Sequence, residues 1–183
     1  MTMTGKPAMT EKERSERIEA MIRVDQAGEF GATRIYAGQL AVMGDRAPGA
    51  GEIAAMATQE ADHLGRFSAL MAERGVRPTA LQPFWDVAGF ALGAATALIG
   101  PEAAMACTAA IEEEIDRHYS HQLDELGDED AELGAMIREF RDDEREHRAT
   151  ALAAGAERAP GYPLLSGAIR LGCRAAIALS KRV

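Results

Sequence analysis

Apolar positions recur along most of the chain with the spacing of amphipathic helices, and glycines and prolines interrupt the pattern. The first helix is expected to begin at a capping box, in which Thr10 is followed by Glu13. Gly75 is typical of a helix end, and Pro101 of a helix start. Helices are therefore expected over 10–43, 52–74, 101–126, 128–154 and 164–181. A further helix is expected in the weakly charged stretch that begins at residue 84.

No segment shows the sustained alternation of a strand, so the pattern predicts an all-α protein. Residues 10–183 are expected to form a single domain built on a four-helix bundle, with an additional hydrophobic helix and a C-terminal amphipathic helix. Residues 1–9 precede the first cap and are expected to be disordered. A cap at Asp128 is expected to start the fifth helix.

The chain repeats itself internally. The segment 29–40 (EFGATRIYAGQL) aligns with 112–123 (EEEIDRHYSHQL) at an offset of 83, with identical Glu, Arg, Tyr, Gln and Leu. The segment 60–63 (EADH) aligns with 144–147 (EREH) at an offset of 84. The repeat predicts a duplicated helical hairpin, in which each copy carries a lone Glu on its first helix and Glu-x-x-His on its second.

The repeated residues have the chemistry of a metal site. Residues three apart share one face of a helix, so the Glu and His of each Glu-x-x-His point the same way. Four carboxylates gathered in a bundle centre must be paired or bind metal, and two divalent cations balance their charge. One Glu-x-x-His alone is more simply a solvated pair, but two at matched positions favour a dinuclear iron or manganese site of the ferritin-like type. The candidate ligands are Glu29, Glu60, His63, Glu112, Glu144 and His147.

Residues near Glu29 are further candidates for the site. Asp25 lies one turn earlier and is expected to accept a hydrogen bond from a ligand imidazole. Gly28 and Gly31 flank Glu29 inside a helix, where each glycine costs roughly 1 kcal/mol relative to alanine. We expect them to open a pocket for the substrate, with close helix packing as the alternative.

Aromatic and imidazole side chains give a second group of candidates. Tyr36 and Tyr119 each lie two turns after a candidate ligand, where they either line the substrate or electron path or fill the core. His118 is the histidine expected to touch substrate, and His121 is expected at the surface. Within the run EEE, Glu113 points about 100° away from Glu112 and is expected to lie outside the ligand set.

Charge limits the partners. The formal net charge is −9, which argues against a nucleic-acid partner. The C-terminal segment differs, since 158–183 holds five basic residues and no acid. Segments 84–106 and 162–183 are candidate membrane-facing helices, and the second is interpreted either as a helix that docks on an anionic membrane or as a packing helix. The spacing of Cys107 and Cys173 fits neither a zinc nor a redox motif.

Four stretches, RVDQAGEFGATRIYAGQL, QEADHL, ACTAAIEEEIDRHYSHQL and FRDDEREHRATAL, resemble the demethoxyubiquinone hydroxylase family of ubiquinone biosynthesis, and the resemblance runs from about Ile18 to Val183. It implies two iron ions per chain, with Glu60 and Glu144 as bridging ligands and Glu29 and Glu112 as terminal ones. It also implies hydroxylation of a polyprenylated 3-demethoxyubiquinol ring with O2.

The resemblance further implies the partners and the location. These are the quinol substrate, a membrane surface, an electron donor (NADH or a reductase) and a lipid-binding accessory protein of ubiquinone biosynthesis. The protein is expected to be peripheral at the cytoplasmic face of a bacterial inner membrane. The alternatives are another ferritin-like oxidase, a di-iron hydroxylase of a tRNA base, and a non-enzymatic helical interaction protein. The acidic charge opposes the tRNA alternative.

Overall fold

A computed structural model describes residues 9–182 of the 183-residue chain, and helices are the only regular structure in that part. The prediction of an all-α protein is confirmed. The elements are α1 (Glu11–Met43), α2 (Ala50–Arg74), α3 (Gln82–Ile99), α4 (Pro101–Leu126), α5 (Ala131–Ala153), the short 3-10 helix η1 (Ala156–Arg158) and α6 (Tyr162–Ser180). Of the segment expected to be disordered, residues 1–8 lie outside the described residues.

Local sequence signals account for most helix ends. The Thr10 hydroxyl accepts from the Glu13 N–H at 3.3 Å, and the Glu13 carboxylate accepts from the Thr10 N–H at 2.8 Å, which completes the expected capping box. The predicted cap at Asp128 is wrong. Asp130 caps α5, because its carboxylate accepts from the Leu133 N–H at 3.0 Å while the preceding residues form the turn after α4.

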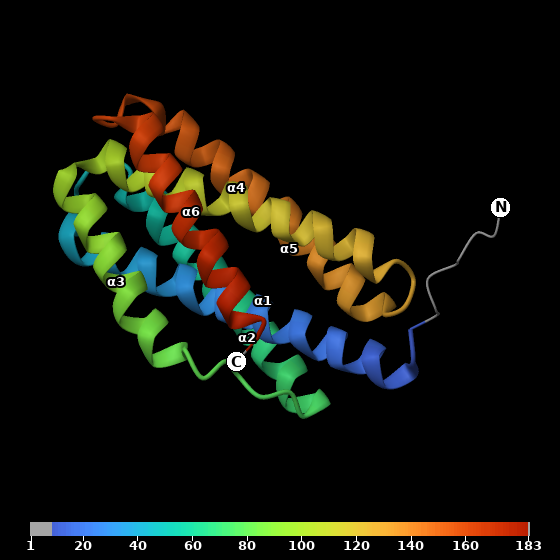
Figure 1. Cartoon of the computed structure of the whole chain (residues 1–183). Coiled ribbons are helices and arrows are strands. Elements are labelled where there is room, and N and C mark those ends of the chain that lie inside the picture. Colours follow the sequence, from blue (N-terminus) through green and yellow to red (C-terminus); the bar gives the residue numbers. More distant parts are fainter. Residues whose placement is uncertain (1–8, 183) are drawn as a thin grey trace.

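Two hairpins form the bundle, as the repeat predicts. Figure 1 shows α1 and α2 as one antiparallel pair and α4 and α5 as the other, with α3 and α6 lying across them. Aromatic residues fill one end of the core, where Phe67 packs edge-on against Phe140 with ring centroids 5.3 Å apart. Small residues fill the other end, including Ala103 and Ala104 of α4. This packing divides the segment 84–106, which was a candidate membrane-facing helix. Its last residues, from Ala103 on, belong to α4 and are buried, so they do not face outward.

Helix α3 lies close against α1 at two glycines. A Cβ added to Gly38 would overlap the carbonyl oxygen of Phe90, and one added to Gly93 would overlap that of Ile35. Only glycine permits this approach. No helix within residues 9–182 combines the length and the apolar character needed to cross a membrane.

Helix α6 is attached to the bundle by ion pairs. Arg170 donates to Glu113 of α4 at 3.2 Å, and Arg174 lies 3.6 Å from Glu114 of the same helix. Arg148 of α5 also donates to Glu113 at 3.2 Å. Two of the five basic residues of the C-terminal segment, Arg170 and Arg174, are thus engaged in packing α6 onto α4, as in the packing interpretation of this helix.

Candidate metal centre

Six acidic and histidine side chains converge in the middle of the four-helix bundle. Each of α1, α2, α4 and α5 contributes, and all six side chains are buried. They form two overlapping groups, each with its ligand atoms within 4.8 Å of one another: Glu29, Glu60, His63 and Glu144 in one, and Glu60, Glu112, Glu144 and His147 in the other. The structure therefore brings together the six residues that the repeat singled out, and two of them, Glu60 and Glu144, belong to both groups.

Both histidines turn the same ring nitrogen toward the centre. The Nδ1 atom of His63 lies 3.6 Å from Glu29 Oε2 and 3.4 Å from Glu144 Oε1. The Nδ1 atom of His147 lies 3.1 Å from Glu60 Oε1 and 3.0 Å from Glu144 Oε2. This places one imidazole at each end of a carboxylate cluster.

The donor atoms at the centre fit a pair of metal ions. Both carboxylate oxygens of Glu60 are buried and have no hydrogen-bond partner, as do one oxygen each of Glu29, Glu112 and Glu144 and the Nδ1 atom of His63. Buried polar atoms are normally satisfied, so this many orphaned oxygens around one point indicate a ligand that carries positive charge. Oxygen and imidazole donors together suit iron or manganese.

Electrostatics favour cations at the same point. Burial raises the pKa of Glu29, Glu60 and Glu112, and at Glu60 repulsion from Glu144 adds to this effect. Burial disfavours the charged form of Glu144, but the nearby rings of His147 and His63 outweigh this effect and lower the pKa of Glu144 to about 2. Without metal the cluster must keep protons, and bound metal ions displace them.

Two tyrosines cross from one hairpin to the other. The Tyr36 hydroxyl of α1 donates to Glu112 Oε1 of α4 at 2.6 Å, and the Tyr119 hydroxyl of α4 donates to Glu29 of α1. Burial and the nearby carboxylates raise the pKa of both tyrosines well above the usual value, so their hydroxyls remain donors. Tyr36 is thus a buried core tyrosine with a satisfied hydroxyl, whereas Tyr119 has a satisfied hydroxyl and also lines an apolar cavity.

The outer nitrogen of each histidine also has a partner from the opposite hairpin. His63 Nε2 lies 3.1 Å from Asp143 Oδ2, and His147 Nε2 lies 3.0 Å from Gln59 Oε1. Sequence reasoning missed both partners. The repeat contained the signal, because Gln59 and Asp143 are separated by the same offset of 84 and each directly precedes the Glu of a Glu-x-x-His.

The partner expected for Asp25 is different. Asp25 is buried, but its Oδ1 atom lies 3.1 Å from His118 Nε2 and not against a ligand imidazole. The reason is that His118 of α4 faces this turn of α1, whereas the ligand histidines on α2 and α5 are held by Asp143 and Gln59. His121 is exposed, as expected, and lies 3.6 Å from Glu125 on its own helix.

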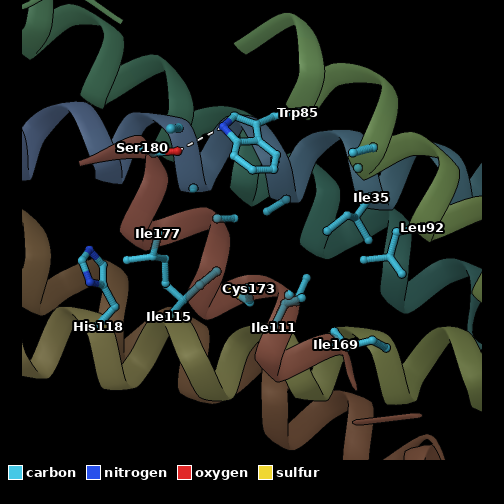
Figure 2. A pocket seen from close by; sticks show the side chains of 18 of the residues that line it. Ile35, Trp85, Leu92, Ile111, Ile115, His118, Ile169, Cys173, Ile177 and Ser180 are labelled. Atoms are coloured by element: carbon cyan, nitrogen blue, oxygen red, sulfur yellow. Dashed lines mark hydrogen bonds between the residues drawn. The ribbon is translucent and has the colours of Figure 1, made fainter. Parts of the chain in front are cut away.

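An apolar cavity of about 460 Å³ lies beside the metal centre. It is enclosed by α1, α3, α4 and α6, and Figure 2 shows Ile35, Leu92, Ile111, Ile169 and Ile177 among its walls. Trp85 Nε1 of α3 donates to Ser180 Oγ of α6 at 3.0 Å, which links the two outer helices across it.

Gly28 and Gly31 line this cavity. A Cβ added to either glycine meets no heavy atom within 4 Å. Close helix packing, which explains Gly38 on the same helix, therefore does not explain these two. None of the six candidate ligands lines the cavity, but Gly28 directly precedes Glu29 and Ile111 directly precedes Glu112, so the cavity lies next to two of them.

Comparisons with known proteins decide the family. The model of the family described as Ubiquinone biosynthesis protein COQ7 matches residues 16–180. The chain belongs to this family. A 3-demethoxyubiquinol 3-hydroxylase of Rhodospirillum rubrum is 56% identical, over 91% of this chain and 78% of the relative. The human NADPH-dependent 3-demethoxyubiquinone 3-hydroxylase, mitochondrial, is 52% identical over the same shares. The Saccharomyces cerevisiae 5-demethoxyubiquinone hydroxylase, mitochondrial, is 41% identical, again over 91% and 78%.

This membership confirms the resemblance drawn from the motifs and the ferritin-like bundle that it implied. Among the alternatives left open by the sequence, it favours a hydroxylase of ubiquinone biosynthesis over a ferroxidase, a manganese catalase, a tRNA hydroxylase and a non-enzymatic protein.

Proposed function

We propose that this protein is a di-iron monooxygenase that hydroxylates the ring of a polyprenylated 3-demethoxyubiquinol. The observation that carries the proposal is a buried centre of four glutamates and two histidines with orphaned donor atoms, next to an apolar cavity. The names of the relatives supply the substrate class.

The six central residues would hold the metals. Glu60 and Glu144 belong to both groups of donors and would bridge two iron ions, while Glu29 with His63 and Glu112 with His147 would complete the two positions. When bound, the iron pair supplies the redox chemistry that activates O2. One oxygen atom enters the ring C–H bond and the other leaves as water, which requires two electrons and two protons. The human relative is named as NADPH-dependent, so a reduced nicotinamide dinucleotide is the donor class that we propose.

The cavity would bind the quinol ring and the first part of its tail. Its walls are mainly isoleucine, leucine, alanine and glycine, which exclude water and suit a prenyl chain. Gly28 and Gly31 leave room for the ring beside Glu29. The polar pair of His118 and Asp25 also lines the cavity and would orient a ring hydroxyl.

The outer helices would bring the protein to the membrane that holds this substrate. Large apolar side chains on α3 and α6 are exposed, among them Val87 at 71%, Leu164 at 81% and Leu171 at 67%. The same two helices wall the cavity, so a lipid surface against them would lie next to the substrate site. We propose a peripheral association at the cytoplasmic face of a bacterial inner membrane. A lipid-binding accessory protein of ubiquinone biosynthesis would share this surface.

The decisive experiment is a single turnover with a short-chain 3-demethoxyubiquinol. The iron-loaded protein is reduced without oxygen, exposed to ¹⁸O2, and the product is analysed by mass spectrometry. We expect a hydroxylated quinol with one ¹⁸O atom in the ring. An unchanged quinol in the presence of fully loaded, reduced protein would contradict the proposal.

A further inference from the structure

The two halves of the metal centre differ in the residues that hold their histidines. Tyr36 on Glu112 mirrors Tyr119 on Glu29, so the terminal carboxylates have matching partners. The histidines do not. A carboxylate, Asp143, holds the outer nitrogen of His63, whereas a neutral amide, Gln59, holds that of His147. These two partners occupy equivalent positions of the repeat, so one and the same place in the fold carries a charge in one half only.

This difference changes the histidine as a ligand. A carboxylate that accepts from one ring N–H makes the other ring nitrogen a stronger donor to a metal than a neutral acceptor does. A carboxylate can also only accept, so it keeps the ring hydrogen on Nε2 and leaves Nδ1 free to bind metal. An amide can present either its oxygen or its NH2 group, so Gln59 constrains His147 less.

The surroundings strengthen the difference. The Phe140 ring stacks on His63 with centroids 3.9 Å apart and an angle of 20° between the planes. At the equivalent place in the other half, 84 residues earlier, stands Met56. The side chain of Asp143 is 28% exposed, so most of it is shielded from the water that would weaken its interaction with the ring.

We infer that the two metal positions are inequivalent and fill in order, first the position of Glu29 and His63 and then the position of Glu112 and His147, with Asp143 and Gln59 as the positioning residues that set the order. The inference rests on the proposed dinuclear centre. The loss of such an outer partner typically lowers metal affinity by about 10- to 100-fold. The dissociation constants of the two binding steps are therefore expected to differ by about 10- to 100-fold.

The test is a calorimetric titration of metal-free protein with Co²⁺, a redox-stable probe of carboxylate and imidazole sites. The parent should bind two ions in separate steps. Asp143→Asn keeps the shape of the side chain but removes its charge, and it should weaken the tight step by about 10- to 100-fold while leaving the weak step in place. Asp143→Glu keeps the negative charge and should therefore keep a tight first step, in contrast to Asp143→Asn. Gln59→Glu should strengthen the weak step.

A matched control is available on the same helix. Asp142 is adjacent to Asp143, but its side chain is 67% exposed and contacts Arg141 and Arg145 instead of a histidine. Asp142→Asn makes the same charge change and should leave both steps unchanged. His63→Ala should remove the tight step and His147→Ala the weak one, which assigns each step to its position.

The possible results separate the inference from the proposed function. Equal steps in the parent, or an Asp143→Asn variant that shifts both steps equally or neither, would overturn the inference while two bound ions per chain sustain the dinuclear centre. Binding of fewer than two ions by the parent would overturn both. If Asp143→Asn does not fold, as judged by its thermal unfolding, an unchanged weak step in Gln59→Glu overturns the inference independently.

Discussion

At the scale of single residues, Glu60 and Glu144 are the two carboxylates that belong to both groups of donors. Glu60 lies in both groups of donors, and neither of its oxygens has a hydrogen-bond partner in the described structure. Both oxygens of Glu60 are thus available to a metal ion, which is the role that we propose for Glu60 and for Glu144.

We expect Glu60→Ala and Glu144→Ala each to lose bound iron and hydroxylation, because each removes a ligand common to both positions. Iron per chain, measured after anaerobic loading, and product formation are the readouts. Glu113→Ala is the control, since Glu113 contacts Arg117, Arg148 and Arg170 and does not face the centre. Normal iron content in both of the first two variants, or iron loss in Glu113→Ala, would refute the ligand assignment.

The glycines of α1 provide a second test. Gly28→Ala should raise the free energy of unfolding by up to about 1 kcal/mol, because alanine favours the helix and its methyl group meets open space. Gly38→Ala should lower it, because its methyl group would overlap Phe90. Denaturant unfolding measures both changes.

A larger side chain at Gly31, which also lines the cavity, should affect substrate binding. Gly31→Leu would fill the cavity and is expected to raise KM for the quinol while iron content stays normal. An unchanged KM in this variant would remove Gly31 from the substrate site, whatever its effect on stability.

At the scale of the elements, α6 closes one side of the cavity, and ion pairs with α4 add to its apolar packing through Leu165 and Ile169. Each of its ion pairs with α4 is worth up to about 1 kcal/mol. Glu113 accepts hydrogen bonds from three arginines, one each on α4, α5 and α6, so it connects these three helices.

Reversal of Arg170 and Arg174 to Glu should therefore loosen α6 rather than merely remove surface charge. Faster amide hydrogen exchange in 162–180 and a raised KM even for a short-chain quinol are expected, because the wall of the cavity moves. The charge swap that combines Arg170→Glu with Glu113→Arg should recover part of the protection. If exchange in α6 stays at the parent level in the double reversal, the ion pairs do not hold this helix.

At the scale of the whole molecule, the protein has an unusual distribution of apolar surface. The bundle buries its own core, yet α3 and α6, which also wall the apolar cavity, expose large side chains. Burial of such a side chain in lipid contributes about 1.5 to 3 kcal/mol. A few of them are enough to hold a protein reversibly at a membrane.

We expect the triple variant Val87→Ser, Leu164→Ser, Leu171→Ser to lose most of its co-sedimentation with anionic liposomes. None of the three side chains lines the cavity, so turnover of a short-chain quinol should persist. Met9→Ser is a control, because Met9 is also exposed but precedes α1 and belongs to neither α3 nor α6. Liposome binding equal to that of the parent would place the membrane contact elsewhere.

The sequence by itself determined the helices and the six central residues. Helix periodicity and caps act over a few residues, and the placement of Glu and His three apart on one face is equally local. The internal repeat then related the two halves without a structure. Even the error at Asp128 was a local one, since Asp130 offers the same side chain two residues later.

Only the tertiary structure decided which side chains meet across the hairpins. Gly28 and Gly38 are the same residue type on the same helix, but α3 passes over one and leaves the other facing a cavity. The sequence left open whether the C-terminal helix docks on a membrane or packs on the bundle, and the ion pair of Arg170 with Glu113 shows that it packs on α4. Tyr119 on Glu29 and Asp143 on His63 likewise depend on how α1 and α2 pack against α4 and α5. Such pairings depend on burial and distance between helices far apart in the chain, which no local pattern of residues specifies.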